Sequence, residues 1–242
     1  MTQPETSSGN RRGQEQWPMT VTAVVDLLPR LRRITLTAEE FRAFVRAGAD
    51  ECFGLLVPAD GRPHLRWYTV REHRPGLAEI DVDVVLHDHG GPAVRWALAA
   101  RPGTRIDFRR SGASYAPPPD CGTQLLLADE TALPALAAIV ESLPPGTAGV
   151  RAVVELPNTS WTYDVGGDVE IEWRPRDGTA PGTRLLEAVV EPGRVGYAWV
   201  CGEAAGVKAV RRDLIRGWGL DRRRITFSGY WRVGREDGYD QG

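Results

Sequence analysis

Two short segments of this sequence carry the side chains best suited to holding a ligand. The run Arg-Trp-Tyr-Thr at residues 66–69 combines a cation, aromatic rings and a hydroxyl. Further along, Gly91 and Pro92 open an apolar stretch that predicts a helix. The N–H groups at a helix N-terminus bind phosphate, and a glycine lets the ligand approach the backbone closely. A flavin nucleotide is flat, forms hydrogen bonds and carries phosphate, so these segments together predict a flavin site.

The first segment has two interpretations. On a strand, Arg66 and Tyr68 share one face, while Thr69 points the other way unless the strand kinks. In the functional interpretation, Tyr68 stacks on the isoalloxazine ring and Arg66 pairs with phosphate. Thr69 forms a hydrogen bond with the flavin near its reactive nitrogen. The structural alternative is a barrel strand with an exposed arginine and ordinary aromatics. The downstream turn favours the functional interpretation, because Pro92 lacks an N–H that the first helical turn does not need.

A pair of histidines close to this turn allows a different kind of site. His87 and His89 flank Asp88, and a His-x-His pattern on a strand places both imidazoles on one face, as in a metal site. A third protein ligand does not follow nearby, so we expect no bound metal. A His87 that contacts phosphate or ribose is the interpretation we favour.

Two turns in the second half resemble each other. Residues 129–132, Asp-Glu-Thr-Ala, lie between an apolar strand and a helix, without the glycine-rich dinucleotide fingerprint. They could cap the helix or dock a nucleotide, and both interpretations stay open. Gly202 and Glu203 repeat this arrangement at a later strand–helix junction, which favours docking. Cys201 just before them is more typical of a core thiol than of a catalytic one.

Composition narrows the class of protein. The 242 residues are 42% hydrophobic and 26% charged, which is typical of a soluble globular protein of one large or two ordinary domains. The net charge of −2 gives no electrostatic reason for a nucleic-acid partner or a stable membrane association. Three widely spaced cysteines predict neither a metal site nor a disulfide framework. The polar N-terminal stretch is unlike a signal peptide, so we expect a cytoplasmic location.

The pattern of elements changes along the chain. Short β-like segments with one helix predict an antiparallel β-barrel, closed and small, over residues 18–116, after a disordered tail over residues 1–17. Alternating strands and helices predict a parallel-sheet α/β domain over residues 117–242, with helices on both faces. A ligand of that sheet should lie beyond the carboxyl ends of its strands. The expected barrel strands are Thr20–Leu28, Leu31–Thr37, Phe53–Val57, Arg66–Arg71, Glu79–Leu86 and Thr104–Phe108.

Five segments, in order and suitably spaced, resemble the siderophore-interacting proteins. These are FAD-dependent ferric-siderophore reductases of the ferredoxin-reductase-like superfamily. The resemblance spans Val21 to Gly234. It rests on Arg66–Arg71, on Asp83–His87 with Gly91–Ala93 and Trp96–Ala97, on Asp129–Pro134, on Trp199–Glu203 and on Gly229–Arg232.

The resemblance implies an FAD-binding barrel followed by an NAD(P)H-binding α/β domain. The FAD contacts that it implies are Arg66, Trp67, Tyr68, Thr69, Asp83, Val85, His87, Gly91, Pro92, Ala93 and Trp96. The NAD(P)H contacts that it implies are Asp129, Glu130, Thr131, Ala132, Gly202, Glu203, Tyr230, Trp231 and Arg232. Two departures affect the details. Asp88 stands where the family has glycine, and residues 109–114 replace a Gly-Pro-Arg-Gly-Ser run.

The implied reaction links two kinds of electron transfer. Nicotinamides donate hydride, ferric iron accepts one electron, and a flavin can do both. The expected substrate is a ferric siderophore, and ferrous iron leaves because it binds hard oxygen donors less well. No catalytic acid, base or nucleophile is needed. Candidate siderophore anchors are Arg42, Arg46, Arg216, Arg232 and Arg235.

Several alternatives remain open at this stage. The flavin could serve another one-electron acceptor, such as a ferredoxin or a quinone, or the protein could bind siderophores without turnover. NADH and NADPH are not distinguished, although Arg174 and Arg176 follow a strand end where a 2′-phosphate might be bound. We expect a monomer, and the siderophore class is not determined.

Overall fold

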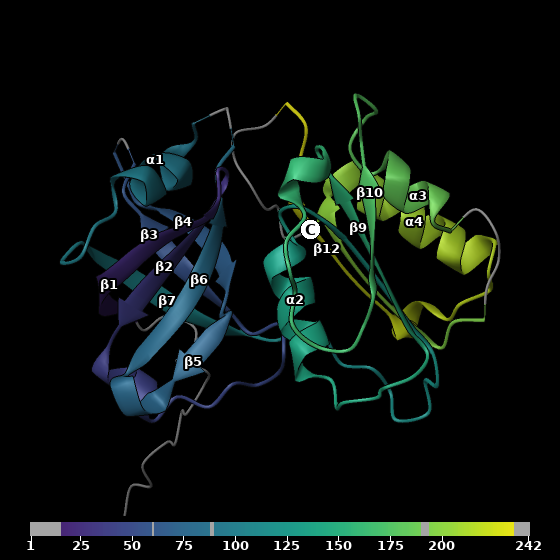
Figure 1. The fold of residues 1–242 in the computed structure, drawn as a ribbon, viewed down its shortest axis with the longest axis horizontal. Helices are drawn as coiled ribbons and strands as arrows, with labels where there is room; N and C mark the ends of the chain where they lie inside the picture. The colour runs from purple at the N-terminus through teal and green to yellow at the C-terminus, as the bar shows by residue number, and fades with distance from the viewer. Residues whose placement is uncertain (1–15, 60, 88–89, 190–193, 235–242) are drawn as a thin grey trace, which may run out of the picture.

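The computed structural model of the chain describes residues 16–59, 61–87, 90–189 and 194–234. Two sheets lie side by side, an antiparallel one from the first half of the sequence and a parallel one from the second (Figure 1). The predicted fold class, an antiparallel barrel followed by a parallel-sheet α/β unit, is confirmed. No helix within these described ranges is long and apolar enough to cross a membrane.

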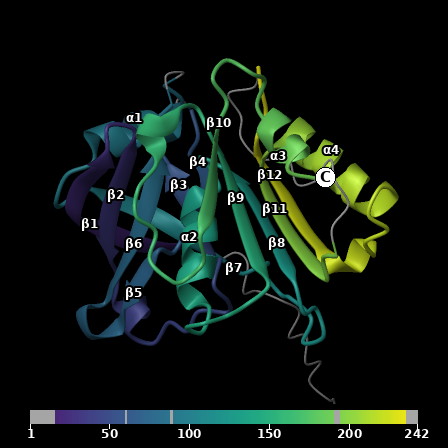
Figure 2. The same ribbon diagram turned by 45° about the vertical axis from the view of Figure 1, so that its right-hand side comes forward.

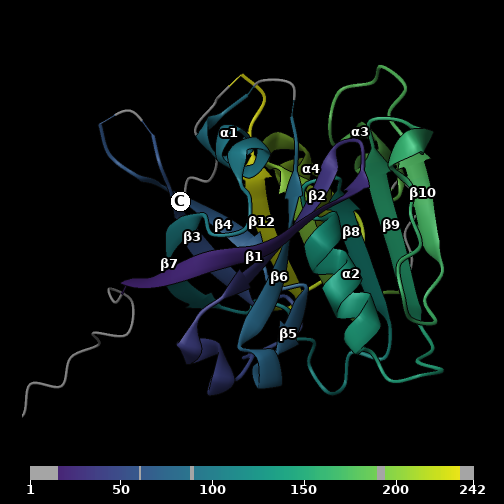
Figure 3. The ribbon, with the colours of Figure 1, turned by 60° about the vertical axis from the view of Figure 1, so that its left-hand side comes forward.

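The first sheet has seven strands in the order β4-β3-β7-β1-β2-β6-β5. Figure 3 shows the long strand β1 crossing the front of this sheet, with helix α1 (Pro92–Ala99) at one end of it. Two short 3₁₀ turns, Glu39–Arg42 and Pro75–Leu77, lie in its loops. The strands are β1 (Gln16–Leu28), β2 (Leu31–Thr37), β3 (Cys52–Val57), β4 (His64–Thr69), β5 (Glu72–Arg74), β6 (Glu79–Val85) and β7 (Arg105–Gly112).

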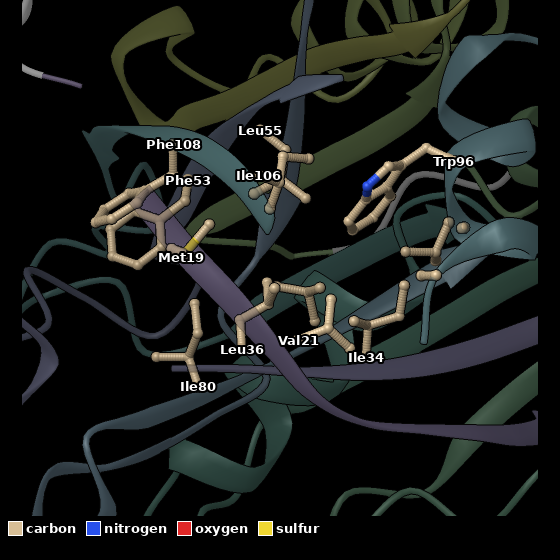
Figure 4. Close-up of a cluster of buried hydrophobic side chains, with 14 of the residues drawn as sticks. Met19, Val21, Ile34, Leu36, Phe53, Leu55, Ile80, Trp96, Ile106 and Phe108 are labelled. Carbon is tan, nitrogen blue, oxygen red and sulfur yellow. The ribbon is translucent and has the colours of Figure 1, made fainter. Parts of the chain in front are cut away.

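Strand β6 shows why the sequence forms this sheet. Its alternate residues Ile80, Val82 and Val84 are buried in the barrel core. Asp81 and Asp83 point the other way, where arginines neutralise them (Arg74 to Asp81 at 2.7 Å, for example). Figure 4 shows the core that the apolar face joins, which includes Phe53, Phe108 and Trp96.

The barrel is not closed by hydrogen bonds. The strand order begins at β4 and ends at β5, and in the described residues no ladder joins these two edge strands. Strand β4 instead lies beside β6 across a seam without ladder bonds. This differs from the closed barrel that the sequence predicts, because closure depends on how the last strands meet. The seam leaves the outer edge of β4 free to face a ligand.

The second sheet has five parallel strands in the order β10-β9-β8-β11-β12. Helix α2 covers the face turned to the barrel, and α3 and α4 cover the other face (Figure 2). The strands are β8 (Gln124–Asp129), β9 (Val150–Leu156), β10 (Ile171–Pro175), β11 (Tyr197–Glu203) and β12 (Ile225–Trp231). The helices are α2 (Leu133–Ser142), α3 (Thr183–Glu187) and α4 (Ala204–Arg216), with 3₁₀ turns at Thr159–Trp161 and Arg222–Arg224.

The two halves are joined by apolar and ionic contacts. Leu31 and Val85 of the barrel belong to the same buried cluster as α2. The Arg71 guanidinium forms a bidentate ion pair with Glu141 on α2, at 2.8 and 3.0 Å. The Trp199 indole of β11 donates to Asp50 of the barrel half at 3.2 Å. These contacts hold the barrel seam next to the edge of the parallel sheet.

Differences from the expected elements are small. Strand β1 starts at Gln16, two residues before the predicted start of the barrel, and the rest of the predicted tail lies outside the described residues. Strand β5 is an addition. Its residues, Glu72–Arg74, are charged or polar throughout and carry no apolar alternation that would predict a strand. The proposed boundary between residues 116 and 117 falls between β7 and β8 and stays a prediction.

Candidate functional site

A cavity of about 560 Å³ lies at the barrel seam, between the two halves of the chain. Its wall comes from β4, from the end of β6 and the start of α1, from the end of β7, from the start of α2 and from β12. The volume is within the range of small-molecule and cofactor sites, which is about 300–1,000 Å³. Segments far apart in the sequence therefore meet at one place that is large enough for a cofactor.

Strand β4 lines the cavity from Leu65 to Thr69, which is all of the strand except its first residue. It can do so because it is an edge strand, with both faces and one backbone edge at the seam. A Cβ on Gly54 would lie 2.5 Å from the Leu65 side chain and 2.9 Å from the Trp67 ring. Glycine at this position therefore lets these two side chains lie close against β3.

Arg66 and Tyr68 lie on the other face of β4, as the sequence predicts. Tyr68 packs against the barrel core and also lines the cavity. Burial raises the pKa of its phenol to about 12. The Arg66 guanidinium donates to the Leu65 carbonyl at 2.9 Å. The strand thus presents a neutral aromatic ring and a cation to the same space.

The N-terminus of α1 forms another part of the wall. Residues Gly91 to Val94 line the cavity, and the N-cap residue, Gly91, forms no side-chain cap hydrogen bond. The first N–H groups of a helix have no partner within the helix, and Pro92 has none to offer. A Cβ on Gly91 would meet nothing within 4 Å, so the space in front of this terminus is open. This is an arrangement that binds phosphate.

The far wall comes from the end of β12. Phe227, Ser228, Tyr230 and Trp231 line the cavity there. The ring of Trp231 lies 6.4 Å from the ring of His87 on the barrel side, between ring centroids. The last strand of the parallel sheet therefore completes a cavity that the barrel begins.

A buried carboxylate holds three segments of this wall together. Asp129, at the end of β8, accepts hydrogen bonds from the Thr131 hydroxyl (2.6 Å), the Glu203 N–H (2.7 Å) and the Trp231 indole (2.7 Å). A Cβ on Gly202 would come within 2.6 Å of this carboxyl group. Glycine at 202 is thus required by the close approach of Asp129.

Burial raises the pKa of Asp129 to about 6, and the neighbouring Glu130 carboxylate acts in the same direction. The hydrogen bonds from Thr131 and Trp231 oppose this shift because they stabilise the charged form. Asp129 is 1% exposed and does not line the cavity itself.

Glu130 belongs to a second buried cluster. Arg176 forms a bidentate pair with Glu130, at 2.6 and 2.8 Å, and also donates to Glu155 at 3.1 Å. Arg174 pairs with Glu172 at 2.6 Å. Arg174 lies within β10 and not, as the sequence predicted, after its end, and Arg176 follows the strand. Both arginines are already paired within the chain.

The structure brings most of the sequence-predicted FAD residues together. Trp96 is the exception, since its indole lies in the barrel core and not on the cavity wall. Those on the wall are Arg66, Trp67, Tyr68, Thr69, Asp83, Val85, His87, Gly91, Pro92 and Ala93. Asp83 is held by Arg33 at 2.7 Å.

The predicted NAD(P)H residues divide into two groups. Thr131, Tyr230 and Trp231 line the cavity, whereas Arg232 does not. The others are buried behind the wall, namely Asp129, Glu130, Ala132, Gly202 and Glu203.

The predicted siderophore arginines are not brought together. Arg46 donates to the Ala49 carbonyl, Arg42 donates to the Gly76 carbonyl, and neither lines the cavity. Arg216 is exposed at the last residue of α4. Since α4 starts at the carboxyl edge of the sheet and runs back, its last residue lies at the far end from the cavity. Arg235, with Asp88 and His89, lies outside the described residues.

One part of the wall was not predicted from the sequence. Gly112 at the end of β7, with Ala113 and Ser114 after it, also lines the cavity. Gly112 has a φ of +151°, and a Cβ there would meet nothing within 4 Å. Asp50 fixes this segment by accepting from the Ser114 N–H and hydroxyl, at 2.9 and 2.6 Å. Gly112 is the one residue in the sequence that could have indicated this part of the wall. A glycine indicates a ligand site only when the space that it faces is known.

Comparison with known proteins places the chain in a family. A model for siderophore-interacting proteins matches residues 122–234, and a model for the siderophore-interacting FAD-binding domain matches residues 56–115. An uncharacterized protein of Mycobacterium tuberculosis is 33% identical over 257 residues, covering 90% of each chain. The chain belongs to the siderophore-interacting protein family.

Other members support this assignment. The siderophore-interacting protein SipS from Aeromonas hydrophila has a TM-score of 0.79 at 29% identity and covers 91% of this chain and 92% of its own. A siderophore utilization protein from T. fusca has a TM-score of 0.79 at 28% identity, covering 94% and 97%. Ferric vibriobactin reductase ViuB of Vibrio cholerae is 29% identical over 189 residues, covering 75% of this chain and 69% of that protein.

The cavity of this siderophore-interacting protein fits FAD. Much of its wall, from Leu65 to Ser114, lies inside the segment that matches the FAD-binding domain. Gly91 and Gly112 leave open space where side chains would fill the cavity. The uncapped α1 terminus suits a pyrophosphate, and the Tyr68 ring suits a flat, conjugated group.

Proposed function

We propose that this protein uses FAD to pass electrons from NADH or NADPH to a ferric siderophore, releasing ferrous iron in the cytoplasm. The observation that carries the proposal is the cavity at the barrel seam. It combines the Tyr68 ring, the open α1 terminus and residues of the C-terminal half on one wall. Relatives named ferric vibriobactin reductase and ferric acinetobactin reductase support the same reaction.

The FAD site in this proposal is built on β4 and α1. Tyr68 would stack on the isoalloxazine, and Thr69 would form a hydrogen bond with it. The N–H groups of Ala93 and Val94 would hold the pyrophosphate, with Arg66 as the nearby cation. When bound, the flavin supplies the chemistry that accepts a hydride and gives up single electrons.

The C-terminal half supplies the side from which the electron donor approaches. Thr131, Tyr230 and Trp231 share the cavity with the FAD residues. Asp129 keeps Thr131 and Trp231 in place through its hydrogen bonds. In the proposed reaction these residues orient the donor and exclude water, and none of them has to act as an acid, a base or a nucleophile.

The ferric siderophore is the substrate of the second half-reaction. An outer-sphere electron transfer needs only that the metal complex comes near the exposed edge of the flavin. The reduced iron binds hard oxygen ligands less strongly, so the chelator releases it. The arginines that the sequence offered as anchors do not line this cavity, and we assign none of them to the siderophore.

Absorption spectroscopy tests the proposal. The purified protein, reconstituted with FAD, should show flavin bands that bleach on anaerobic addition of NADH or NADPH. The bands should return on addition of a ferric siderophore, with ferrous iron trapped by a colorimetric chelator. Bleaching that only a ferredoxin or a quinone reverses would identify another acceptor. A protein that takes up no FAD but binds ferric siderophores would be a binding protein without turnover.

A further inference from the structure

Open α/β sheets bind nucleotides beyond the carboxyl ends of their strands, where a pyrophosphate rests on a helix N-terminus. In this protein α2 follows β8 and α4 follows β11, so both helices begin at that edge of the sheet. The N–H groups of their first turns are the donors that a bound dinucleotide would need. Their present partners therefore decide whether such a ligand can be held there.

A carboxylate of the chain itself occupies the first turn of α4. The Glu203 Oε2 atom accepts hydrogen bonds from the N–H groups of Ala205 and Gly206, at 2.7 and 2.8 Å. Glu203 is 4% exposed, so its side chain is fixed inside the protein. An anionic ligand would have to displace this negative charge before it could reach the helix.

Carboxylates also accept backbone hydrogen bonds beside the other two helices that begin at this edge, although no side chain caps the first turn of α2 itself. Asp129 Oδ1 accepts from the N–H groups of Thr131 and Ala132, at 2.9 and 3.3 Å, just before α2. Glu155 accepts from those of Gly182 and Arg184, both at 2.8 Å, at the start of α3. Each of these carboxylates stands at or next to the end of a parallel strand.

The start of α4 also lacks space for a ligand. A Cβ on Gly206, in the first turn of α4, would lie 2.6 Å from the Cα of Gly182. The loop before α3 thus packs directly on the backbone of α4. A pyrophosphate could not enter between them without moving the main chain.

The charge at this edge also disfavours a polyanion. Arg176 is bound by both Glu130 and Glu155, and its side chain is 11% exposed. Asp129 and Glu203 add two further carboxyl groups without a cationic partner among the described contacts. Phosphates placed here would meet carboxylates, and Arg176 is not available to bind a 2′-phosphate.

The α1 terminus in the barrel is different. Its N-cap residue, Gly91, forms no side-chain cap hydrogen bond, and the cavity reaches the helix there. In the described part of the chain, the edge of the parallel sheet therefore binds its own carboxylates, while the α1 terminus stays open for the phosphates of the flavin nucleotide.

We propose that the protein recognises only the nicotinamide–ribose half of its electron donor, through Thr131, Tyr230 and Trp231, and leaves the adenosine half in solvent. This inference rests on the proposed function, because it concerns the donor of that reaction. It follows that the 2′-phosphate, and even the whole adenosine part, contribute little to binding. Reduced nicotinamide mononucleotide should therefore replace NADH and NADPH.

Anaerobic bleaching of the FAD-loaded protein compares the three donors directly. A hydrogen bond to a charged phosphate is worth about tenfold or more in binding, so without such a bond the values of kcat/KM should agree within about tenfold. A larger preference for either dinucleotide over the mononucleotide, or for NADPH over NADH, would overturn the inference.

Calorimetry with ADP-ribose and its 2′-phosphate gives a readout that does not depend on turnover. The FAD-loaded protein should show no binding at about millimolar ligand, which corresponds to less than about 4 kcal/mol. FAD titrated into the apoprotein is the positive control for a correctly folded sample. Micromolar binding of ADP-ribose contradicts the inference even if the reaction is as proposed. Absence of bleaching with every nicotinamide instead contradicts the proposed function.

Discussion

The indole N–H of Trp231 donates a hydrogen bond to the carboxylate of Asp129 at 2.7 Å, across the carboxyl edge of the parallel sheet. Trp231 lines the cavity and Asp129 lies behind it, 1% exposed. This bond fixes the last residue of β12 against the end of β8. It connects a buried charge to the wall of the proposed cofactor site, so both stability and cofactor environment should depend on it.

Replacing Trp231 by Phe removes this donor and leaves the buried carboxylate short of one partner. We expect a loss of about 1–3 kcal/mol in the free energy of unfolding, measured in urea, together with a shift of the visible flavin bands. Trp218→Phe is the matched control, because Trp218 donates to the Val189 carbonyl at 2.9 Å and does not line the cavity. That control should lose stability without altering the flavin bands. A Trp231→Phe variant with unchanged stability and spectrum would contradict this account.

The raised pKa of Asp129 predicts a pH-dependent contribution to stability. The pKa is about 6 in the folded protein, against an ordinary value of 3.8 for an aspartate. The folded state therefore binds the proton more tightly than the unfolded state. The contribution is fully present below pH 3.8 and is lost as the pH rises through about 6.

Asp129→Asn isolates this effect from the other ionisable groups. The difference in unfolding free energy between wild type and variant should move against the wild type by on the order of 3 kcal/mol as the pH rises through that window. Urea titrations of both proteins at several pH values measure it. A difference that is independent of pH, or that changes in the opposite direction, would show that Asp129 titrates at or below its ordinary value.

Gly91→Val tests the phosphate position at α1. Gly91 has a φ of −56°, which other residues adopt readily, and its missing Cβ faces open space at the cavity. The added side chain should lower FAD affinity by about tenfold or more, without unfolding the protein. Quenching of FAD fluorescence gives the dissociation constant. Gly76→Val, at another open position away from the cavity, is the control and should bind FAD as the wild type does.

Arg71→Met tests the ionic contact between the two halves. Arg71 is 5% exposed and also donates to Asp83 at 3.3 Å, and the Asp83 side chain is fully buried. Glu141 keeps partial access to water, and Asp83 keeps Arg33 as a partner. We therefore expect a loss of about 2–4 kcal/mol in the free energy of unfolding, at or below the lower part of the range for a broken buried pair. Arg151→Met removes an exposed pair with Glu172 and should cost less than about 1 kcal/mol. Equal losses in the two variants would mean that the buried Arg71 contact stabilises the protein no more than an exposed ion pair does.

Much of the fold follows from local patterns. The alternation of apolar and acidic residues in Ile80–Val84 predicts a strand, and β6 confirms it. The apolar run that becomes β8 and the helix that follows it are likewise predicted, because period-two and helical patterns are properties of neighbouring residues. The Arg66–Thr69 strand and the glycine-proline turn were also found from the sequence, since each is a continuous segment with its own chemistry.

What the sequence by itself determined is therefore most of the elements, the family and the two local segments of the proposed cofactor site. Only the tertiary structure decided which side chains meet. Burial placed Trp96 in the core, and the direction of α4 placed Arg216 away from the cavity. Sequence position alone allowed Asp129 and Glu203 as nucleotide contacts. In the structure Asp129 accepts hydrogen bonds from the turn before α2, and Glu203 accepts them from the first turn of α4. The reason is physical: a strand or helix is encoded by short-range repetition, whereas the partner of a carboxylate is whichever donor the packing of distant segments brings within about 3 Å.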